Sequence, residues 1–219
     1  MKRKSGFEPS LVLVAALVLG GCGAGDHAAA TPSAVGKAAP WAQEVATGDE
    51  LWQVSSEGLT LTAYAMGEDT AEYDSYAADD ETNELLVVAG DPIMFVNLVL
   101  TNNGDEVRYL TTRQPMLVAA PRESPYMRQG VAEITRASSA QWESHNLSYE
   151  SLQKGSSYHS PFALAPGESC ARGFILPLKL GHEWGFVGSV WVFGGVDEHG
   201  LAADSGRAVR FDTRYYTFN

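Results

Sequence analysis

Hydrophobic and polar residues alternate with a period of two in much of the chain beyond residue 49. In the clearest stretch, Leu59, Leu61 and Ala63 alternate with two threonines and a tyrosine. A strand with one buried face produces this alternation, because successive side chains point to opposite sides of a sheet. The pattern therefore predicts a half-buried strand over residues 59–64.

Two longer apolar stretches follow, Glu84–Ala89 and Ile93–Leu100, separated by Gly90-Asp91-Pro92. Gly-Asp-Pro is typical of a turn or a sheet edge. The second stretch ends at Thr101-Asn102-Asn103-Gly104-Asp105, whose Asn-Gly predicts a hairpin before a strand at Val107–Leu110. Further short strands are expected, for a total of eight or nine, at Pro115–Ala119, Ser169–Leu178, Phe186–Phe193 and Ala208–Phe218.

Helix is expected to be a minor component, because no stretch carries a 3.6-residue apolar stripe longer than about ten residues. The best candidate is Asn146–Lys154, where Asn146 or Ser148 can cap the start and Gly155 can end it. The segment 121–159 is otherwise long, polar and irregular. The pattern predicts an all-β fold, an antiparallel β-sandwich over residues 49–219 with this insertion and at most one or two short helices.

The first residues have a different pattern. Lys2, Arg3 and Lys4 precede an unbroken run of Leu, Val and Ala at Leu11–Leu19, which is typical of a signal peptide. The run is about half of the roughly 20 residues that a helix needs to cross a bilayer. A permanent transmembrane anchor is therefore disfavoured.

The apolar run ends in Leu19-Gly20-Gly21-Cys22, which resembles the lipobox of bacterial lipoproteins. This resemblance implies that residues 1–21 are a signal peptide, that the Cys22 thiol receives a diacylglyceryl group, and that Cys22 becomes the first mature residue. Two acyl chains suffice for stable anchoring, so we expect a lipid-anchored protein at the extracytoplasmic face of the cell membrane. The alternative is a plain secreted protein whose cysteine follows the apolar run by chance.

Residues 22–48 are expected to form a disordered tether. The part from Gly23 to Pro40 is dominated by Ala, Gly, Pro, Ser and Thr and has almost no large side chain to bury. A flexible tether of this length spans roughly 20–30 Å. The aromatic residues that build a core become frequent only beyond Trp41, which favours one folded domain over residues 49–219.

Two segments of this domain resemble immunoglobulin-like domains of bacterial surface lipoproteins. Residues 93–105 are similar to their hairpin, in which a strand is followed by Thr-Asn-x-Gly-Asp. Residues 164–169, Leu-Ala-Pro-Gly-Glu-Ser, and the apolar Phe174–Pro177 are similar to their turn leading into a strand. The resemblance implies an immunoglobulin-like sandwich of the telokin-like kind and no particular catalytic activity.

The formal net charge of the chain is −12 and its pI is about 4.7. Removal of residues 1–21 takes away three basic residues and Glu8, which makes the mature charge −14. Nucleic-acid binding is disfavoured, because phosphates require clustered Lys and Arg. The expected partners are the membrane, through lipidated Cys22, and an unknown protein or envelope ligand.

Acidic residues are concentrated in one segment. No Lys or Arg occurs between Lys37 and Arg108, whereas the segment from Glu68 to Asp91 holds nine carboxylates. Calcium takes six to eight oxygen ligands, and Asp79, Asp80 and Glu81 are the first candidates for such a site. The spacing does not match an EF-hand loop, and the alternative is a solvated acidic loop between two strands. No other cofactor is expected.

Other candidate chemistry is sparse. The histidines show no metal-ligand spacing, and they are His27, His145, His159, His182 and His199. No nucleophile elbow, Ser-x-x-Lys, P-loop or Rossmann glycine pattern occurs. Once Cys22 is acylated, Cys170 has no obvious partner, and it is either a reactive thiol or a small buried apolar residue on its strand.

Aromatic residues on the irregular insertion indicate a contact surface. Trp142 and Tyr158 lie there, outside the predicted strands, and Trp and Tyr dominate binding hot spots. We therefore expect a non-catalytic binding or interaction module of the cell envelope, with no catalytic residue assigned. The alternative is an envelope hydrolase or metal-binding protein that uses acidic and histidine residues on the same scaffold.

Overall fold

The computed structural model describes most of the domain beyond residue 35. The described residues are 36–42, 45–75, 85–111, 116–121, 135–147, 161–180, 183–212 and 214–217, with residues 116–121 described by their backbone. All of them belong to one compact unit, Ala34–Asn219. The predicted signal peptide, Cys22 and most of the predicted tether lie outside the described residues.

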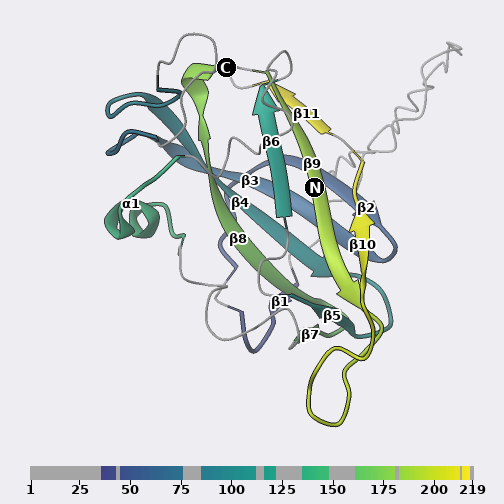
Figure 1. Ribbon diagram of the computed structural model, residues 1–219. Helices are drawn as coiled ribbons and strands as arrows, with labels where there is room; N and C mark the ends of the chain where they lie inside the picture. The colour runs from purple at the N-terminus through teal and green to yellow at the C-terminus, as the bar shows by residue number, and fades with distance from the viewer. Residues whose placement is uncertain are drawn as a thin grey trace, which may run out of the picture. The chain divides into compact units, whose positions relative to one another are not determined.

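The first sheet has five strands in the order β1-β8-β4-β3-β2 (Figure 1). Its strands are β1 (Lys37–Ala38), β8 (Glu168–Pro177), β4 (Pro92–Asn102), β3 (Leu59–Thr70) and β2 (Asp49–Ser56). All neighbours are antiparallel except β1, which runs parallel to the start of β8. The consecutive strands β2, β3 and β4 form a meander.

The second sheet is built around β9 (Glu183–Phe193). One edge of β9 pairs with β10 (Arg207–Arg210) and β11 (Arg214–Thr217). Its other edge pairs with β5 (Arg108–Leu110) and β6 (Met116–Pro121), and β5 also pairs with β7 (Phe162–Leu164). Five strands of this sheet thus pair with the long β9 or with its neighbour β5.

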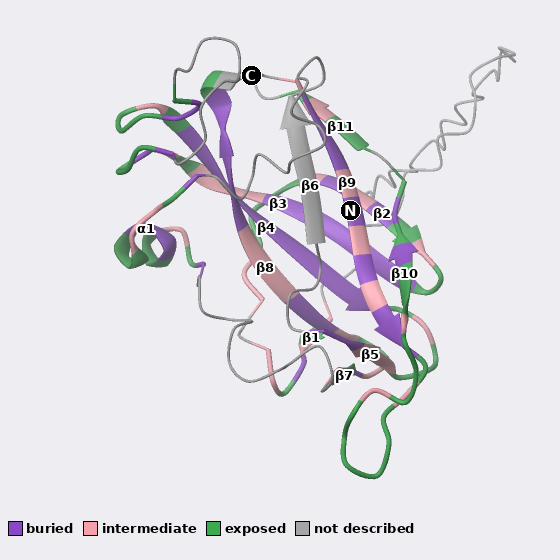
Figure 2. Ribbon diagram, viewed as in Figure 1, coloured by how far each residue is buried: buried purple, intermediate pink, exposed green. Residues whose placement is uncertain are grey.

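The core lies between the two sheets, where apolar side chains from both inner faces form one cluster. Figure 2 shows that buried residues follow the long strands β3, β4, β8 and β9. Leu59, Leu61 and Ala63 of β3 are fully buried there, as are Trp184 and Val190 of β9. Burial of such side chains is the main favourable term in folding. The predicted all-β sandwich is confirmed, and helix in the described part is limited to α1 (Ser139–Ser144) and the 3-10 turn Leu178–Leu180.

The outer face of β3 differs from the half-buried strand that the alternation predicts. Thr60, Thr62 and Tyr64 are also buried, at 4%, 6% and 7% exposure. Hydroxyl groups pair across this face, with Thr60 Oγ1 at 2.8 Å from Ser55 Oγ. Polar side chains on the outer face are thus covered and hydrogen-bonded, which alternation alone does not reveal.

The predicted strand positions hold for most of the chain. The apolar stretches predicted at 93–100, 107–110, 115–119, 169–178 and 186–193 correspond to β4, β5, β6, β8 and β9. The stretch predicted at Ala208–Phe218 is divided into β10 and β11 around buried Phe211.

The strand predicted at Glu84–Ala89 is wrong in its described part. Leu85 forms an isolated bridge, and residues 86–90 form bends and a turn in which Val87 is completely buried. The backbone of Val87 bonds to Ser75 instead of to a neighbouring strand, because its amide donates to Ser75 Oγ at 3.2 Å and its carbonyl accepts from Ser75 N at 2.8 Å. Apolar content alone therefore indicated burial correctly and secondary structure incorrectly.

The predicted tether ends earlier than expected, because residues 36–42 form part of the fold. We call them the N-terminal strap. Lys37 and Ala38 pair with Glu168 and Ser169 of β8, and Ala39 is 1% exposed in the core. Trp41 stacks on Phe162 of β7, with ring centroids 4.7 Å apart, and its indole N–H donates to Ala163 O at 2.5 Å.

The helix lies before the predicted position. Ser138 caps α1, since its Oγ accepts from Gln141 N at 3.2 Å. Asn146, the expected start of a helix, follows α1 instead and has a positive φ of 55°. Asn tolerates this left-handed conformation better than most residues, which suits a helix end. Residues 148–154 lie outside the described part.

Candidate functional site

Helix α1 packs on the outer face of the first sheet and closes a second apolar cluster. The buried members of this cluster are Ala71, Val87, Ile93, Phe95, Trp142, Leu147 and Ile175. The Trp142 ring meets the Phe95 ring edge-on, at a centroid distance of 5.2 Å and an interplanar angle of 85°. Gly173 of β8 makes room for the indole, because a Cβ there would lie 2.6 Å from Trp142 Cζ3.

This packing corrects the role expected for Trp142. Its side chain belongs to the apolar cluster and the residue is only 6% exposed. An aromatic ring that fills the space above Gly173 contributes to stability and has little surface to offer a partner. Tyr158, the other predicted contact residue, lies outside the described residues.

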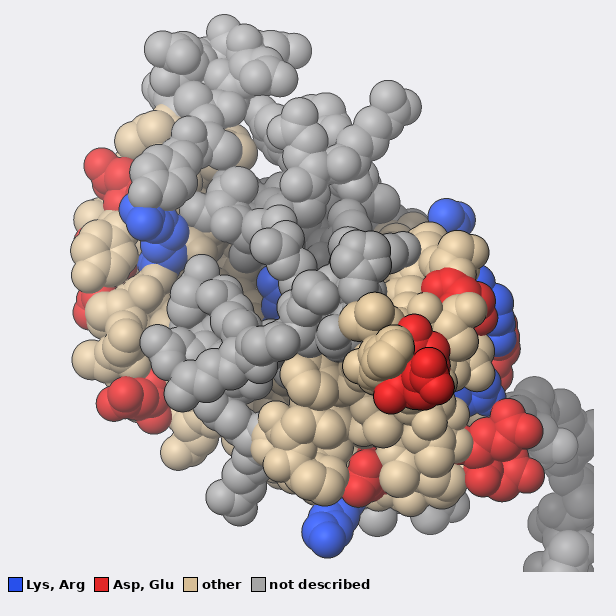
Figure 3. Space-filling view, turned by 60° about the horizontal axis from the view of Figure 1, so that its bottom comes forward, with Lys and Arg blue, Asp and Glu red and all other residues tan. Residues whose placement is uncertain are grey.

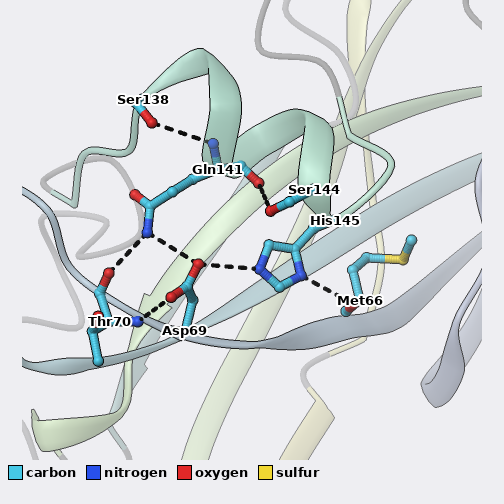
Figure 4. A network of polar contacts seen from close by, with 7 residues as sticks. All are labelled: Met66, Asp69, Thr70, Ser138, Gln141, Ser144 and His145. Atoms are coloured by element: carbon cyan, nitrogen blue, oxygen red, sulfur yellow. Dashed lines mark hydrogen bonds and ion pairs between the residues drawn. The ribbon is translucent and has the colours of Figure 1, made fainter.

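A polar network joins α1 to the end of β3 beside this cluster (Figure 4). Gln141 Nε2 donates to Asp69 Oδ2 at 3.1 Å and to the carbonyl oxygen of Thr70 at 2.8 Å. Thr70 N donates to Asp69 Oδ1 at 2.7 Å. Hydrogen bonds from the Thr70 amide, Gln141 and His145 lower the pKa of Asp69 below its ordinary value of 3.8. The carboxylate is thus held in its ionised form.

His145 completes the network from the residue that follows α1. Its Nε2 lies 3.4 Å from Asp69 Oδ2, and its Nδ1 lies 3.3 Å from the carbonyl oxygen of Met66. The ring stacks on Phe95 at a centroid distance of 4.2 Å and an angle of 18°. Its side chain is 14% exposed. A β-bulge between Ala65 and Gly67 shifts the register of β3 at the point where the ring contacts the strand.

The chemistry of this arrangement is positional. A histidine beside a carboxylate resembles part of a general-base pair, yet each ring nitrogen of His145 already faces an oxygen atom of β3. In the described structure both ring nitrogens are thus occupied by contacts within the domain. The network therefore orients α1 on the sheet.

The predicted calcium ligands Asp79, Asp80 and Glu81 lie outside the described residues. Of the acidic segment around them, Asp74 Oδ1 accepts from Ala89 N at 2.9 Å, and Asp91 Oδ2 lies 2.6 Å from Lys179 Nζ. The described residues hold no group of three or more His, Cys, Asp or Glu side chains arranged to bind a metal ion. The calcium prediction stays open.

Cys170 is fully buried on β8 and forms no disulfide. Burial raises the pKa of its thiol to about 12, because the thiolate would lose its hydration. The interpretation as a small buried apolar residue is confirmed, and the reactive alternative is wrong for the folded protein.

The Asp69–Gln141–His145 network was not identified from the sequence, which singled out His145 only as one of five scattered histidines. Gln141 and His145 lie 72 and 76 positions after Asp69 in the chain, so no local spacing connects the three residues. The one available signal was Ser138, a favoured residue for a helix start, and it was not used.

No helix in the described part is both long and apolar enough to span a membrane. Comparison with protein families, with characterised proteins and with solved structures finds no match to this chain.

Proposed function

We propose that this chain is a lipid-anchored lipoprotein of the extracytoplasmic face, whose β-sandwich is a non-catalytic binding module of the cell envelope. The observation that carries the proposal is the order of residues at the start of the chain: three basic residues, the apolar run Leu11–Leu19, and Leu19-Gly20-Gly21-Cys22. Acylation of Cys22 supplies two chains, enough for stable anchoring.

The N-terminal strap supports a tethered arrangement. Fourteen residues separate Cys22 from Lys37, and a flexible chain of that length spans roughly 20 Å. The strap enters the fold beside Glu168, at the end of the sandwich where β8 begins. Its pairing with β8 and the packing of Trp41 on β7 make this end of the domain the place where the N-terminal segment is attached.

The charges at this end favour a protein partner over an anionic lipid surface. The turns between β2 and β3, β4 and β5, β7 and β8, and β9 and β10 meet there, since Asn103 N donates to Gly58 O, Gly167 N donates to Asn102 O and Arg207 contacts Glu57. Figure 3 shows several patches of Asp and Glu, with Lys and Arg among them, on the face that it presents. The acidic residues of these turns are Glu57, Asp105, Glu106, Glu168, Asp197, Glu198 and Asp204. Among the described cations here, Arg108 and Arg207 already contact Glu57. Such a surface is repelled by anionic lipid headgroups.

Mass spectrometry of the protein from bacterial membranes tests the anchor. We expect a mature chain that begins at Cys22 and carries the mass of a diacylglyceryl group, and a Cys22→Ser variant that leaves the membrane fraction. Cys170→Ser is the matched control, since Cys170 is buried in the fold. An unacylated chain with residues 1–21 intact would contradict the proposal.

Site-specific photo-crosslinking in intact cells tests the binding function. A photoreactive residue at position 199, whose histidine side chain is 74% exposed, samples the β9–β10 loop. We expect one adduct of defined mass that disappears in the Cys22→Ser background although the domain stays folded. Absence of any adduct from position 199 and from the turns at 57, 105 and 166 would contradict a binding role of this end.

A further inference from the structure

Strands β10 and β11 lie along one edge of the second sheet (Figure 1). Both pair with β9, and neither pairs with a further strand among the described residues. Phe211 N donates to Gly188 O at 3.0 Å, which makes these two residues a hydrogen-bonded pair of the antiparallel ladder. Hydrogen-bonded and non-hydrogen-bonded pairs alternate in such a ladder. The register therefore directs the N–H and C=O groups of Ala208 and Arg210 away from β9.

These outward backbone groups are available to another strand. Ala208 and Arg210 are both exposed, and no hydrogen bond joins their outward groups to the part of the chain that the structure describes. A row of unpaired donors and acceptors at a sheet edge is a template on which an extended peptide can add a strand. The backbone of β10 thus offers a site for an extended chain.

The same edge carries positive charge, although the chain as a whole has a net charge of −12. Arg207, Arg210 and Arg214 lie within eight residues that contain one acid, Asp212. Arg207 is paired with Glu57. Arg210 and Arg214 are exposed and form no ion pair within the described residues. Because charges beyond about 8 Å are screened at physiological salt, these local cations favour an anionic partner.

We propose that this edge binds an extended acidic peptide, which adds to the second sheet as a further strand and places carboxylates beside Arg210 and Arg214. The term β10 edge denotes here the outward backbone groups of Ala208 and Arg210 together with the guanidinium groups of Arg210 and Arg214. The proposal goes beyond the proposed function, because the β10 edge is a surface separate from the turns described above and does not require the lipid anchor.

The register predicts the residue pattern of the partner. Gly188 faces the core, since a Cβ there would lie 2.3 Å from Leu61 Cδ2, and its neighbour Ser189 therefore faces outward. Arg210 is paired with Ser189 and faces outward with it, whereas Val209 is buried. Side chains directly opposite each other on neighbouring strands share a face. An acidic residue opposite Arg210 and an apolar residue opposite Val209 make the partner alternate between acidic and apolar positions.

The arginines favour an acidic partner over a second copy of this chain. Two β10 edges paired with each other would bring arginines together, and like charges on neighbouring strands are destabilising. Charged side chains at a sheet edge commonly prevent such self-pairing. An acidic strand meets the opposite situation, because each guanidinium group can then pair with a carboxylate.

Fluorescence anisotropy with the full chain in detergent tests the β10 edge. The probe is a labelled peptide of about eight residues in which Glu and Val alternate, long enough to pass both arginines. We expect saturable binding that weakens about tenfold in the double variant Arg210→Gln, Arg214→Gln. Lys37→Gln is the matched control, because Lys37 is an exposed cation on the edge of the other sheet, and it should bind as the wild type does. Absence of binding, or equal binding by the double variant, would overturn the proposal.

A second probe separates strand addition from attraction by charge alone. The same peptide with methylated backbone amides keeps its carboxylates but cannot donate to the carbonyl oxygens of Ala208 and Arg210, so we expect it to lose most of its affinity. Equal affinity of the two peptides would refute strand addition and indicate an anionic ligand, such as an acidic polysaccharide, held by charge. A dimer that the peptide dissociates in sedimentation would show that a second copy occupies the edge and would also refute the proposal. None of these variants alters Cys22 or the turns probed by crosslinking, so this proposal and the proposed function can fail separately.

Discussion

Two segments of the chain leave the sandwich and are held by different forces. Helix α1 lies on the outer face of the first sheet and buries Trp142 and Leu147 in an apolar cluster. The loop between β9 and β10, residues 194–206, buries no large side chain, and its Val196 and Leu201 are 37% and 42% exposed. One segment is stabilised by burial and the other by its own hydrogen bonds.

The β9–β10 loop is organised by two aspartates. Asp197 Oδ1 accepts from the amides of His199 and Leu201, both at 2.9 Å. The two carboxylate oxygens of Asp204 accept from Gly194 N at 2.9 Å and Gly206 N at 2.8 Å. Asp side chains commonly replace backbone acceptors in turns. These bonds are local, so the loop can hold its form without support from the core.

The two histidine–acid pairs show what this difference means. His199 lies 3.5 Å from Glu198, but the two side chains are 74% and 87% exposed. Water and salt screen such a pair almost completely. The His145–Asp69 pair is partly buried, with its side chains 14% and 35% exposed, and joins separate elements, so this contact bears on the packing of α1. Burial, and not the presence of an acid beside a histidine, decides which pair contributes to the fold.

The largest expected effect is the loss of the Trp142 ring. Trp142→Ala removes a buried indole next to Phe95 and leaves a cavity above Gly173, which should lower the free energy of unfolding by about 3–5 kcal/mol. Leu201→Ala in the β9–β10 loop should change it by less than about 0.5 kcal/mol. Urea unfolding measures both. Similar losses for the two variants would show that the distinction between the segments is wrong.

A pair of glycines sharpens the comparison. Gly173→Ala places a Cβ 2.6 Å from Trp142 Cζ3, and because the indole is wedged against Phe95, we expect a loss of about 1–3 kcal/mol. Gly195→Ala in the loop meets nothing within 4 Å and should change stability by less than about 0.5 kcal/mol. Thermal unfolding followed by circular dichroism compares the two. If Gly173→Ala left the stability of the protein unchanged, α1 would be able to move away from β8 without a loss of stability, contrary to this prediction.

The sequence predicted the sandwich because alternation is set by local geometry. The inner residues of β3 and β4 had to be apolar at every second position, and this signal was read correctly. Residues 85–89 and 36–42 were misread because their partners are distant. Val87 is apolar without forming a strand, since Ser75 satisfies its backbone. The strap is poor in large side chains, yet Ala39 lies in the core cluster and Trp41 packs against it.

The site was less predictable than the fold. Gly173 and Trp142 fit together across 31 positions of the chain, and neither has a distinctive neighbourhood in the sequence. The Asp69 network depends on a β-bulge within β3 and on the short helix α1, which covers the outer face of the first sheet. A pattern of exposed and buried positions cannot specify which element covers that face, because several polar segments of this chain have similar composition.

Substitutions of the residues that cap the two segments are expected to change the free energy of unfolding less. Ser138→Ala removes the hydroxyl that accepts from Gln141 N and should lower the free energy of unfolding by about 0.5–2 kcal/mol. Asp197→Ala should leave global stability almost unchanged but speed hydrogen exchange at the amides of His199 and Leu201. Urea unfolding and hydrogen exchange measure the two effects. A global loss in Asp197→Ala would show that the loop supports the core.

The smallest expected effect concerns acid stability. The pKa of Asp69 is lowered in the folded chain, so its stabilising contribution is complete above about pH 4 and is lost as pH falls through the lowered value. Asp69→Asn has no such contribution to lose. Its melting temperature should therefore fall less than that of the wild type between pH 5 and pH 3, whereas Glu198→Gln, at an 87% exposed position, should follow the wild type. Identical acid profiles for wild type and Asp69→Asn would mean that the carboxylate gains nothing from Thr70, Gln141 and His145.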